Sequence, residues 1–314
     1  MKSIHLIAPS GASLDDKSPL AGIDWLKSQG IAIQNSECVQ RVHERFSGKD
    51  EVRLNELNKL AILDPQTVVM AMRGGYGIHR LLPNIDWAGI AKVISNGLQI
   101  SGHSDFTAFQ LGLLAKTGAI TLSGPMLNYD FGKLDDGGKA IAPDKFMWSH
   151  FKTAIQERKL DCSVSASQSF LAKASCVPVK GMLWGGNLTV LAGLVGTPFL
   201  PFPQQTKNGI LFLEDVNEHP YRLERMLMQL LDAAILNNQS AIMLGGFSGY
   251  RLYDNDKGYT FERAIEAIRL RLPDTIPILT GLPFGHQANK LTLPMGAQAN
   301  LDYNANGFTL KANW

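Results

Sequence analysis

The chain has 314 residues, which is more than one hydrophobic core usually supports, so the sequence predicts two domains. Its 45% apolar and 18% charged residues are typical of a folded globular protein and argue against disorder. The 30 lysines and arginines nearly balance the 28 aspartates and glutamates, and no long basic block is present. We therefore expect no nucleic-acid or membrane partner and favour a small substrate.

The N-terminal segment and the cysteines predict a cytoplasmic location. About five apolar residues precede Pro9, fewer than the roughly 7–15 of a signal-peptide core. No apolar run approaches the ~20 residues of a membrane span. The three cysteines are odd in number and widely spaced, and they form neither a CxxC pair nor a disulfide framework.

The first half of the sequence alternates short apolar runs with helical patterns. The predicted elements are a strand at 4–8, a helix at 18–30, a strand at 31–33, a helix at 49–63, strands at 67–72 and 98–102, a helix at 106–116 and a strand at 119–124. Strands that alternate with helices indicate βαβ units, and hence a doubly wound parallel sheet.

The pattern changes near residues 159–182, where a Ser- and Ala-rich stretch shows strand-like alternation without a long helix. We therefore assign 1–160 to an N-terminal domain, 161–176 to a linker and 177–314 to a C-terminal domain. The second half then predicts strands at 209–215, 241–247 and 276–281 and an amphipathic helix at 220–237.

Three loops carry unusual residues after predicted strands, where ligands collect in a parallel sheet. The first, "MRGGYG" at 72–77, has two adjacent glycines whose N–H groups are unhindered. Such a loop can form an anion nest or an oxyanion hole. The alternative is a plain turn that needs positive φ, and by itself the loop favours that alternative. It matches neither GxGxxG nor a Walker A motif.

The second loop is "SGHSDF" at 101–106, which places Ser104 between a strand and a helix. A serine there can be a nucleophile, because the next N–H, that of Asp105, lies at a helix N-terminus. G-x-S-x-G is not matched, since Phe106 replaces the second glycine. The alternative, a helix cap at Ser104 or Asp105, is common, and by itself this loop favours that alternative. His103 is expected to be structural, because neighbours along the chain generally project apart.

The third loop, "LFLEDVNEHP", places Glu214 at the end of a strand, where a carboxylate could orient a histidine or lie on a solvated turn. His286 follows the 276–281 strand in a Gly/Pro-rich connection and is the most plausible general base among the seven histidines. No HExxH or EF-hand spacing is present, so the sequence predicts neither a metal site nor a cofactor.

These loops, in this order, resemble those of the LD-carboxypeptidase family, serine peptidases that include muramoyltetrapeptide carboxypeptidase. The resemblance spans nearly the whole chain. It rests on "IAPSG", "RFSGKDEVRLNELNKL", "AMRGGYGIHRLLPNID", "GHSDFTAF", "GPM", "GGNLTVL", "FLEDVNEHPYRLERML" and "GLPFGHQANKLTLPMG". It implies a flavodoxin-like or class I amidotransferase-like N-terminal sheet carrying the serine, a second α/β domain carrying the glutamate and histidine, an active site between them, and a homodimer.

Carried over motif by motif, the resemblance implies Ser104 as nucleophile, His286 as base and Glu214 as the orienting carboxylate. It also implies an oxyanion hole from the N–H groups of Gly75 and Asp105. Family members usually have an aromatic residue before the nucleophile, where this chain has His103.

Substrate contacts can be suggested for a few further residues. Arg73 or Arg80 could pair bidentately with a substrate carboxylate. Tyr76 is a further candidate substrate contact. Trp184 could form a pocket wall, although a core tryptophan is an equal alternative.

The expected activity is hydrolysis that releases the terminal D-alanine of murein tetrapeptides, free or sugar-linked. A first alternative, within the same family, is a self-immunity peptidase that cleaves peptide–nucleotide antibiotics. A second alternative, from another class, is a non-catalytic α/β ligand-binding protein.

Overall fold

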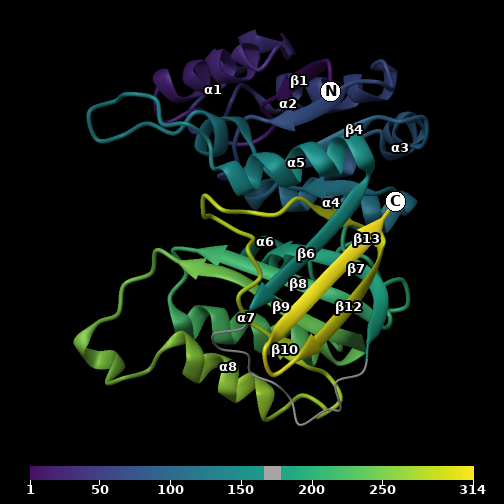
Figure 1. The fold of residues 1–314 in the computed structure, drawn as a ribbon, viewed down its shortest axis with the longest axis vertical. Coiled ribbons are helices and arrows are strands. Elements are labelled where there is room, and N and C mark those ends of the chain that lie inside the picture. The colour runs from purple at the N-terminus through teal and green to yellow at the C-terminus, as the bar shows by residue number, and fades with distance from the viewer. Residues whose placement is uncertain (166–177) are drawn as a thin grey trace.

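The computed structural model describes residues 1–165 and 178–314 and contains two sheets, each with its own helices (Figure 1). The first sheet is mostly parallel and the second is mixed. The expected fold class, an α/β protein of two domains, is confirmed. The fold places the carboxyl ends of strands from both sheets near the boundary between them.

The first sheet has the strand order β11-β5-β4-β3-β1-β2. Its strands are β1 (Ser3–Ile7), β2 (Ala32–Gln34), β3 (Val68–Ala71), β4 (Gln99–Gly102), β5 (Thr121–Ser123) and β11 (Leu293–Met295). All neighbours are parallel except β11, which runs antiparallel to β5. The strand at the centre, β3, is buried along its whole length, as its continuous apolar run predicts.

Helices cover both faces of this sheet, as a doubly wound fold requires. The helices are α1 (Lys17–Ser28), α2 (Asp50–Asn58), α3 (Trp87–Ser95), α4 (Thr107–Thr117) and α5 (Lys145–Glu157). Successive side chains of β3 enter opposite layers. Val68 and Met70 join the core beneath α1 and α5, whereas Val69 and Ala71 join the core beneath α2, α3 and α4.

The second sheet has the order β10-β9-β8-β7-β12-β13-β6. Its strands are β6 (Lys159–Ser165), β7 (Val179–Asn187), β8 (Gly209–Val216), β9 (Gln239–Ser248), β10 (Ile278–Leu279), β12 (Gln298–Asn304) and β13 (Gly307–Asn313). The run from β7 to β10 is parallel, and the other neighbours are antiparallel. Three helices accompany it: α6 (Leu188–Gly193), α7 (Pro220–Asp232) and α8 (Phe261–Arg269).

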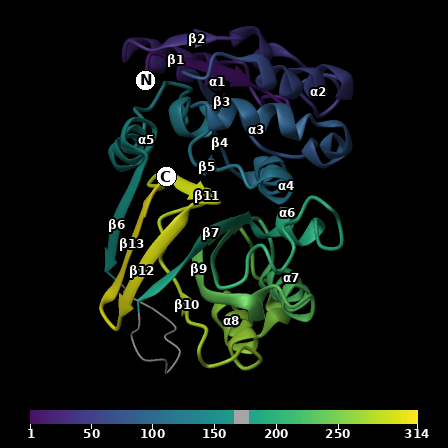
Figure 2. The same cartoon turned by 90° about the vertical axis from the view of Figure 1, so that its right-hand side faces the viewer.

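The chain crosses between the sheets more than once, which a single cut in the sequence does not capture. β6 pairs with β13 in the second sheet, so residues 161–165 of the expected linker form part of a strand. Residues 166–176 of that linker lie outside the described residues. β11, from the C-terminal half, joins the first sheet through β5 and lies at the boundary between the domains (Figure 2).

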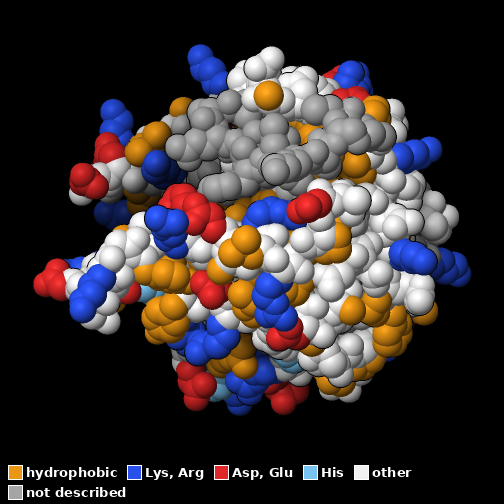
Figure 3. All heavy atoms as spheres, turned by 90° about the horizontal axis from the view of Figure 1, so that it is seen from below, with side chains coloured by type: hydrophobic (Ala, Val, Ile, Leu, Met, Phe, Trp, Pro, Cys, Tyr) orange, Lys and Arg blue, Asp and Glu red, His pale blue; other side chains and the backbone are white. Residues whose placement is uncertain are grey.

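The described residues contain no helix that is both long and apolar enough to cross a membrane. The face seen in Figure 3 carries lysine, arginine, aspartate and glutamate side chains interspersed with one another. This mixed surface agrees with the net charge of +2.

Candidate active site

Ser104 lies at a sharp turn between β4 and α4. It begins a short 3-10 helix, Ser104–Phe106, and has a φ of 61°. A left-handed conformation costs a non-glycine residue of order 1–3 kcal/mol and is found most often at functional sites. His103 occupies the N-cap position of this helix and its side chain makes no capping hydrogen bond, whereas Ser104 Oγ is directed toward His286. The turn thus has the backbone character of a nucleophile elbow without the second glycine.

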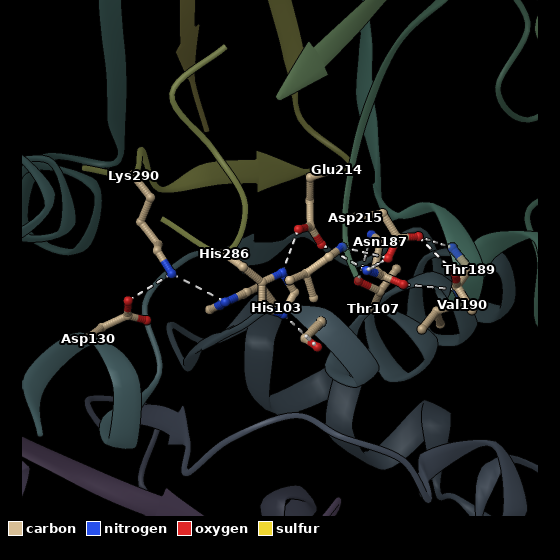
Figure 4. Close-up of polar contacts among 12 residues, drawn as sticks. His103, Thr107, Asp130, Asn187, Thr189, Val190, Glu214, Asp215, His286 and Lys290 are labelled. Carbon is tan, nitrogen blue, oxygen red and sulfur yellow. Dashed lines mark hydrogen bonds and ion pairs between the residues drawn. The ribbon is translucent and has the colours of Figure 1, made fainter. Parts of the chain in front are cut away.

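His286 joins the two halves of the sequence at this turn. Its Nδ1 lies 2.8 Å from Glu214 Oε2 (Figure 4). Its Nε2 lies 3.1 Å from Ser104 Oγ. The Glu214 carboxylate is an acceptor, so Nδ1 carries the proton and Nε2 presents its lone pair to the serine hydroxyl. Glu214 is completely buried, whereas the His286 side chain is 23% exposed. The base is therefore reachable from solvent and its orienting carboxylate is not.

A buried amide network holds Glu214 in place. Asn187, at the end of β7, donates from Nδ2 to Glu214 Oε1 at 3.1 Å and to Asp215 Oδ1 at 3.2 Å. Asp215 also accepts from the N–H and the hydroxyl of Thr189, both at 2.8 Å. Burial raises the pKa of Asp215, and the Thr189 hydrogen bonds partly offset this rise. The sequence predicts no role for Asn187, although it belongs to the motif "GGNLTVL" on which the family resemblance partly rests.

The glycine loop lies directly over the serine. A Cβ added at Gly74 would meet Ser104 Cβ at 2.6 Å, its Oγ at 2.7 Å and the Asp105 nitrogen at 3.1 Å. The next residue, Gly75, has a φ of 110°, which favours glycine. Within the described residues, neither the N–H of Gly75 nor that of Asp105 donates to another protein group. Both donors are therefore free for a ligand beside the hydroxyl.

The Asp105 carboxylate has a separate, structural part in the site. It is 4% exposed and accepts from Ser10 Oγ at 2.8 Å and from the Ile78 N–H at 3.1 Å. These contacts join β1 and the glycine loop to the serine turn. Burial raises the pKa of Asp105, opposed by the hydrogen bonds from Ser10 and Ile78. Arg53, fully buried, reinforces the loop by donating to the Gly77 carbonyl at 3.1 Å.

A cavity of about 580 Å³ opens beside Ser104 and His286. Its lining comes from both domains and includes Gly75, Met126, Tyr129, Asn217 and Gln287. This volume lies within the roughly 300–1,000 Å³ of small-molecule sites.

The structure places the suggested substrate contacts in different surroundings. Arg73 lines the cavity. Tyr76 lies outside the lining, with its ring 6.1 Å from that of Phe46. Trp184 is completely buried in β7 and donates to Gln239 Oε1 at 2.9 Å, so it is a core residue rather than a pocket wall. The sequence pattern of β7 does not show on which side Trp184 lies, because both faces of the second half of this strand are buried. Arg80, the alternative to Arg73, forms an ion pair with Asp50.

Three further charged or polar side chains line the same cavity and were not predicted to act together. His103 does not contact Ser104 with its ring; it lies 5.3 Å from the His286 ring, between Gly124 and Lys290. Lys290 pairs with Asp130 at 2.7 Å. Among the described residues, no group of three or more His, Cys, Asp or Glu could hold a metal ion.

The site has the arrangement of a serine hydrolase, and comparisons with known proteins give its family. Residues 4–124 match the LD-carboxypeptidase N-terminal domain, and residues 180–301 match the LD-carboxypeptidase C-terminal domain. The chain belongs to the LD-carboxypeptidase family.

Individual relatives match over nearly the whole chain. The crystal structure of muramoyltetrapeptide carboxypeptidase from Oxalobacter formigenes is 39% identical, covers 100% of this chain and 99% of its own, and has a TM-score of 0.86. A murein tetrapeptide carboxypeptidase of Pseudomonas aeruginosa is 29% identical over 96% of this chain and 93% of its own. The microcin C7 self-immunity protein of Escherichia coli is 29% identical over 90% and 84%, respectively.

Proposed function

We propose that this protein is a serine-type LD-carboxypeptidase that releases the terminal D-alanine from murein tetrapeptides during peptidoglycan recycling in the cytoplasm. The observation that carries the proposal is the unbroken hydrogen-bonded series Ser104–His286–Glu214, drawn from distant parts of the sequence. The names of the Oxalobacter and Pseudomonas relatives support the choice of substrate.

The chemistry follows from the positions of the three side chains. Ser104 Oγ attacks the carbonyl carbon of the L,D peptide bond while His286 Nε2 takes its proton. The negative charge on the carbonyl oxygen is stabilised by the N–H groups of Gly75 and Asp105. His286 then protonates the D-alanine nitrogen as the C–N bond breaks. Water, activated by the same histidine, then hydrolyses the acyl-enzyme. Throughout the reaction Glu214 accepts the hydrogen bond from His286 Nδ1.

Arg73 is the residue we propose for recognition of the substrate's terminal carboxylate. Its Nη1 donates to the Ala12 carbonyl at 2.6 Å, which fixes the guanidinium at the cavity wall. None of the ion pairs among the described residues involves Arg73, and its Nε is buried without a hydrogen-bond partner. A fixed guanidinium without a counter-ion suits a carboxylate, which it can bind through two parallel hydrogen bonds.

The two alternatives differ from this proposal in the substrate and in the presence of catalysis, respectively. A self-immunity peptidase would cleave a peptide–nucleotide, and the similarity to the microcin C7 self-immunity protein of Escherichia coli keeps this alternative in view. A ligand-binding protein would not need a base within hydrogen-bonding distance of a free serine hydroxyl, and the series described above weighs against it.

The decisive experiment measures D-alanine released from a murein tetrapeptide by the wild type and by Ser104→Ala. Parallel reactions use a C-terminally amidated tetrapeptide, an aminoacyl-nucleotide analogue and a chelator-treated sample. We expect loss of roughly 10⁵–10⁶-fold in kcat for Ser104→Ala, poor cleavage of the amide and no effect of the chelator. Full activity in Ser104→Ala would sink the mechanism, and faster cleavage of the nucleotide analogue would favour the first alternative.

We also propose a homodimer, on the family resemblance. Light scattering would then give twice the chain mass of 34.3 kDa, and a mass equal to one chain would exclude the proposal.

A further inference from the structure

Three buried side chains that the proposed chemistry does not use lie beside the proposed base. Lys290 Nζ is 2.7 Å from Asp130 Oδ1 and 3.2 Å from His103 Nε2 (Figure 4). Lys290 and His103 are each 2% exposed, and Asp130 is 6% exposed. A lysine buried to this degree is rare unless it is paired, so its contacts with Asp130 and His103 are what allow Lys290 to be buried here.

The hydrogen bonds fix the protonation state of the histidine. His103 Nδ1 lies 2.9 Å from the Gly124 carbonyl oxygen, which can only accept, so Nδ1 carries the proton. Nε2 is then an acceptor, and it receives a hydrogen bond from the Lys290 ammonium group. Burial, with the neighbouring Lys290 and His286, lowers the pKa of His103 well below its ordinary value. His103 is therefore neutral, and among the described residues Asp130 is the carboxylate that pairs with Lys290.

The ion pair joins the two domains at the catalytic centre. Lys290 follows His286 by four residues, in the same connection between β10 and β11. Asp130 belongs to the short helix Leu127–Phe131 that follows β5 in the first domain, and its Oδ2 accepts from the Met126 N–H at 2.8 Å. The connection that carries the base is thus fastened to the domain that carries the nucleophile.

His103, which accepts a hydrogen bond from Lys290, makes a second contact with the base. The His103 ring lies 5.3 Å from the His286 ring at an interplanar angle of 71°, an edge-to-face arrangement. His103 directly precedes Ser104 in the chain. Lys290 therefore holds the ring that packs against the base, as well as the backbone that carries the base.

We propose that Lys290 and Asp130 are positioning residues, which hold His286 within hydrogen-bonding distance of Ser104 directly and through His103. The proposal rests on the proposed function in that His286 is the base. A buried ion pair often contributes little net stability compared with apolar residues of similar size, and in some proteins its role is to specify one geometry. A displacement of about 1 Å between reacting groups can cost roughly a hundredfold in rate, so such specification matters here.

The test compares Lys290→Met, Asp130→Asn and the double variant, with kcat, KM and Tm measured for each. Either single variant leaves one buried charge unpaired, so we expect a lower Tm and a lower kcat. The double variant leaves no unpaired charge. We expect its Tm to recover toward that of the wild type while its kcat stays roughly tenfold to a hundredfold lower, with KM nearly unchanged. Lys311→Met, which removes a surface lysine near Asp161, is the matched control and should match the wild type.

Two results would overturn the proposal. Recovery of both Tm and kcat in the double variant would leave the pair a purely structural role. A raised KM with unchanged kcat would make Lys290 a substrate contact instead.

Two readouts separate this inference from the proposed function. A crystal structure of the double variant should show His286 Nε2 beyond hydrogen-bonding distance of Ser104 Oγ, and an unchanged distance would contradict the proposal without reference to any substrate. Labelling of Ser104 by a fluorophosphonate should slow in the double variant. If the wild type neither cleaves the tetrapeptide nor is labelled, the proposed function fails; if it does both and the double variant equals it, only this inference fails.

Discussion

The residue before the nucleophile makes the stability of this protein depend on pH in a way that can be measured. The pKa of His103 is lowered by burial, by Lys290 and by His286, so the folded protein keeps this ring neutral. In the unfolded chain a histidine titrates near pH 6.5. The unfolded state therefore binds the proton more tightly, and acid favours unfolding.

Because acid destabilises the fold through His103, the variant His103→Phe should be less sensitive to pH. The contribution of the neutral histidine to the free energy of unfolding is fully present above about pH 6.5. It is lost as the pH falls, by up to about 1.4 kcal/mol per pH unit. We expect the free energy of unfolding of His103→Phe to fall less than that of the wild type between about pH 7.5 and about pH 5. Urea unfolding at both pH values measures this, with the exposed His43→Gln as control. Equal losses in the wild type and His103→Phe would contradict the assigned protonation state.

The residues differ in how far the sequence alone could reveal them. Ser104 and His286 follow predicted strands and Glu214 lies at the end of one, and the carboxyl ends of parallel strands meet at one edge of a sheet. The order of strands and loops in the sequence therefore already predicts that these three side chains lie close together. The contact between Lys290 and His103 joins positions 187 residues apart, and neither residue type marks a partner at that distance. Only tertiary packing reveals such a pair.

At the scale of elements, the glycine loop and the serine turn form one unit. Gly74 has no room for a side chain, because a Cβ would lie 2.6 Å from Ser104 Cβ. The sequence suggested Gly75 and the positive φ of such turns, and Gly75 does have positive φ. The close approach at Gly74 depends on two strands of the first sheet, β3 and β4, being neighbours. Steric fit between two loops is invisible until that pairing is known.

This contact predicts that Gly74→Ala displaces the nucleophile. The added methyl group must push the serine turn or the glycine loop aside, which also moves the N–H groups of Gly75 and Asp105. We expect kcat to fall by roughly a hundredfold and the unfolding free energy by about 1–3 kcal/mol. Gly193→Ala is the matched control, because a Cβ at Gly193 in α6 meets nothing within 4 Å. Wild-type kcat in Gly74→Ala would show that the loop does not constrain Ser104.

At the scale of the molecule, one hydrophobic core extends across both domains, while a second lies on the other face of the first sheet. A single cluster of buried residues contains Phe109 of α4, Trp184 of β7, Leu213 of β8 and Leu293 of β11. β11 strengthens this continuity, because it leaves the second domain and pairs with β5 of the first sheet. The length of the sequence predicts two domains, and the change of pattern predicts a single linker between them at 161–176. The exchange of β11 has no local signal, since a short apolar strand can join either sheet.

The shared core predicts that catalysis and folding are lost together. If the domains opened first, His286 would leave Ser104 while most secondary structure remained, and activity would disappear at a lower urea concentration than the circular dichroism signal. We expect the two curves to coincide. Leu293→Ala, which removes a fully buried side chain at the domain boundary, should shift both curves together to lower urea, by about 2–5 kcal/mol of unfolding free energy. Leu270→Ala, at a leucine that is 88% exposed, should shift neither. Activity lost well before the dichroism signal in the wild type would mean that the domains separate independently despite the strand that β11 contributes to the first sheet.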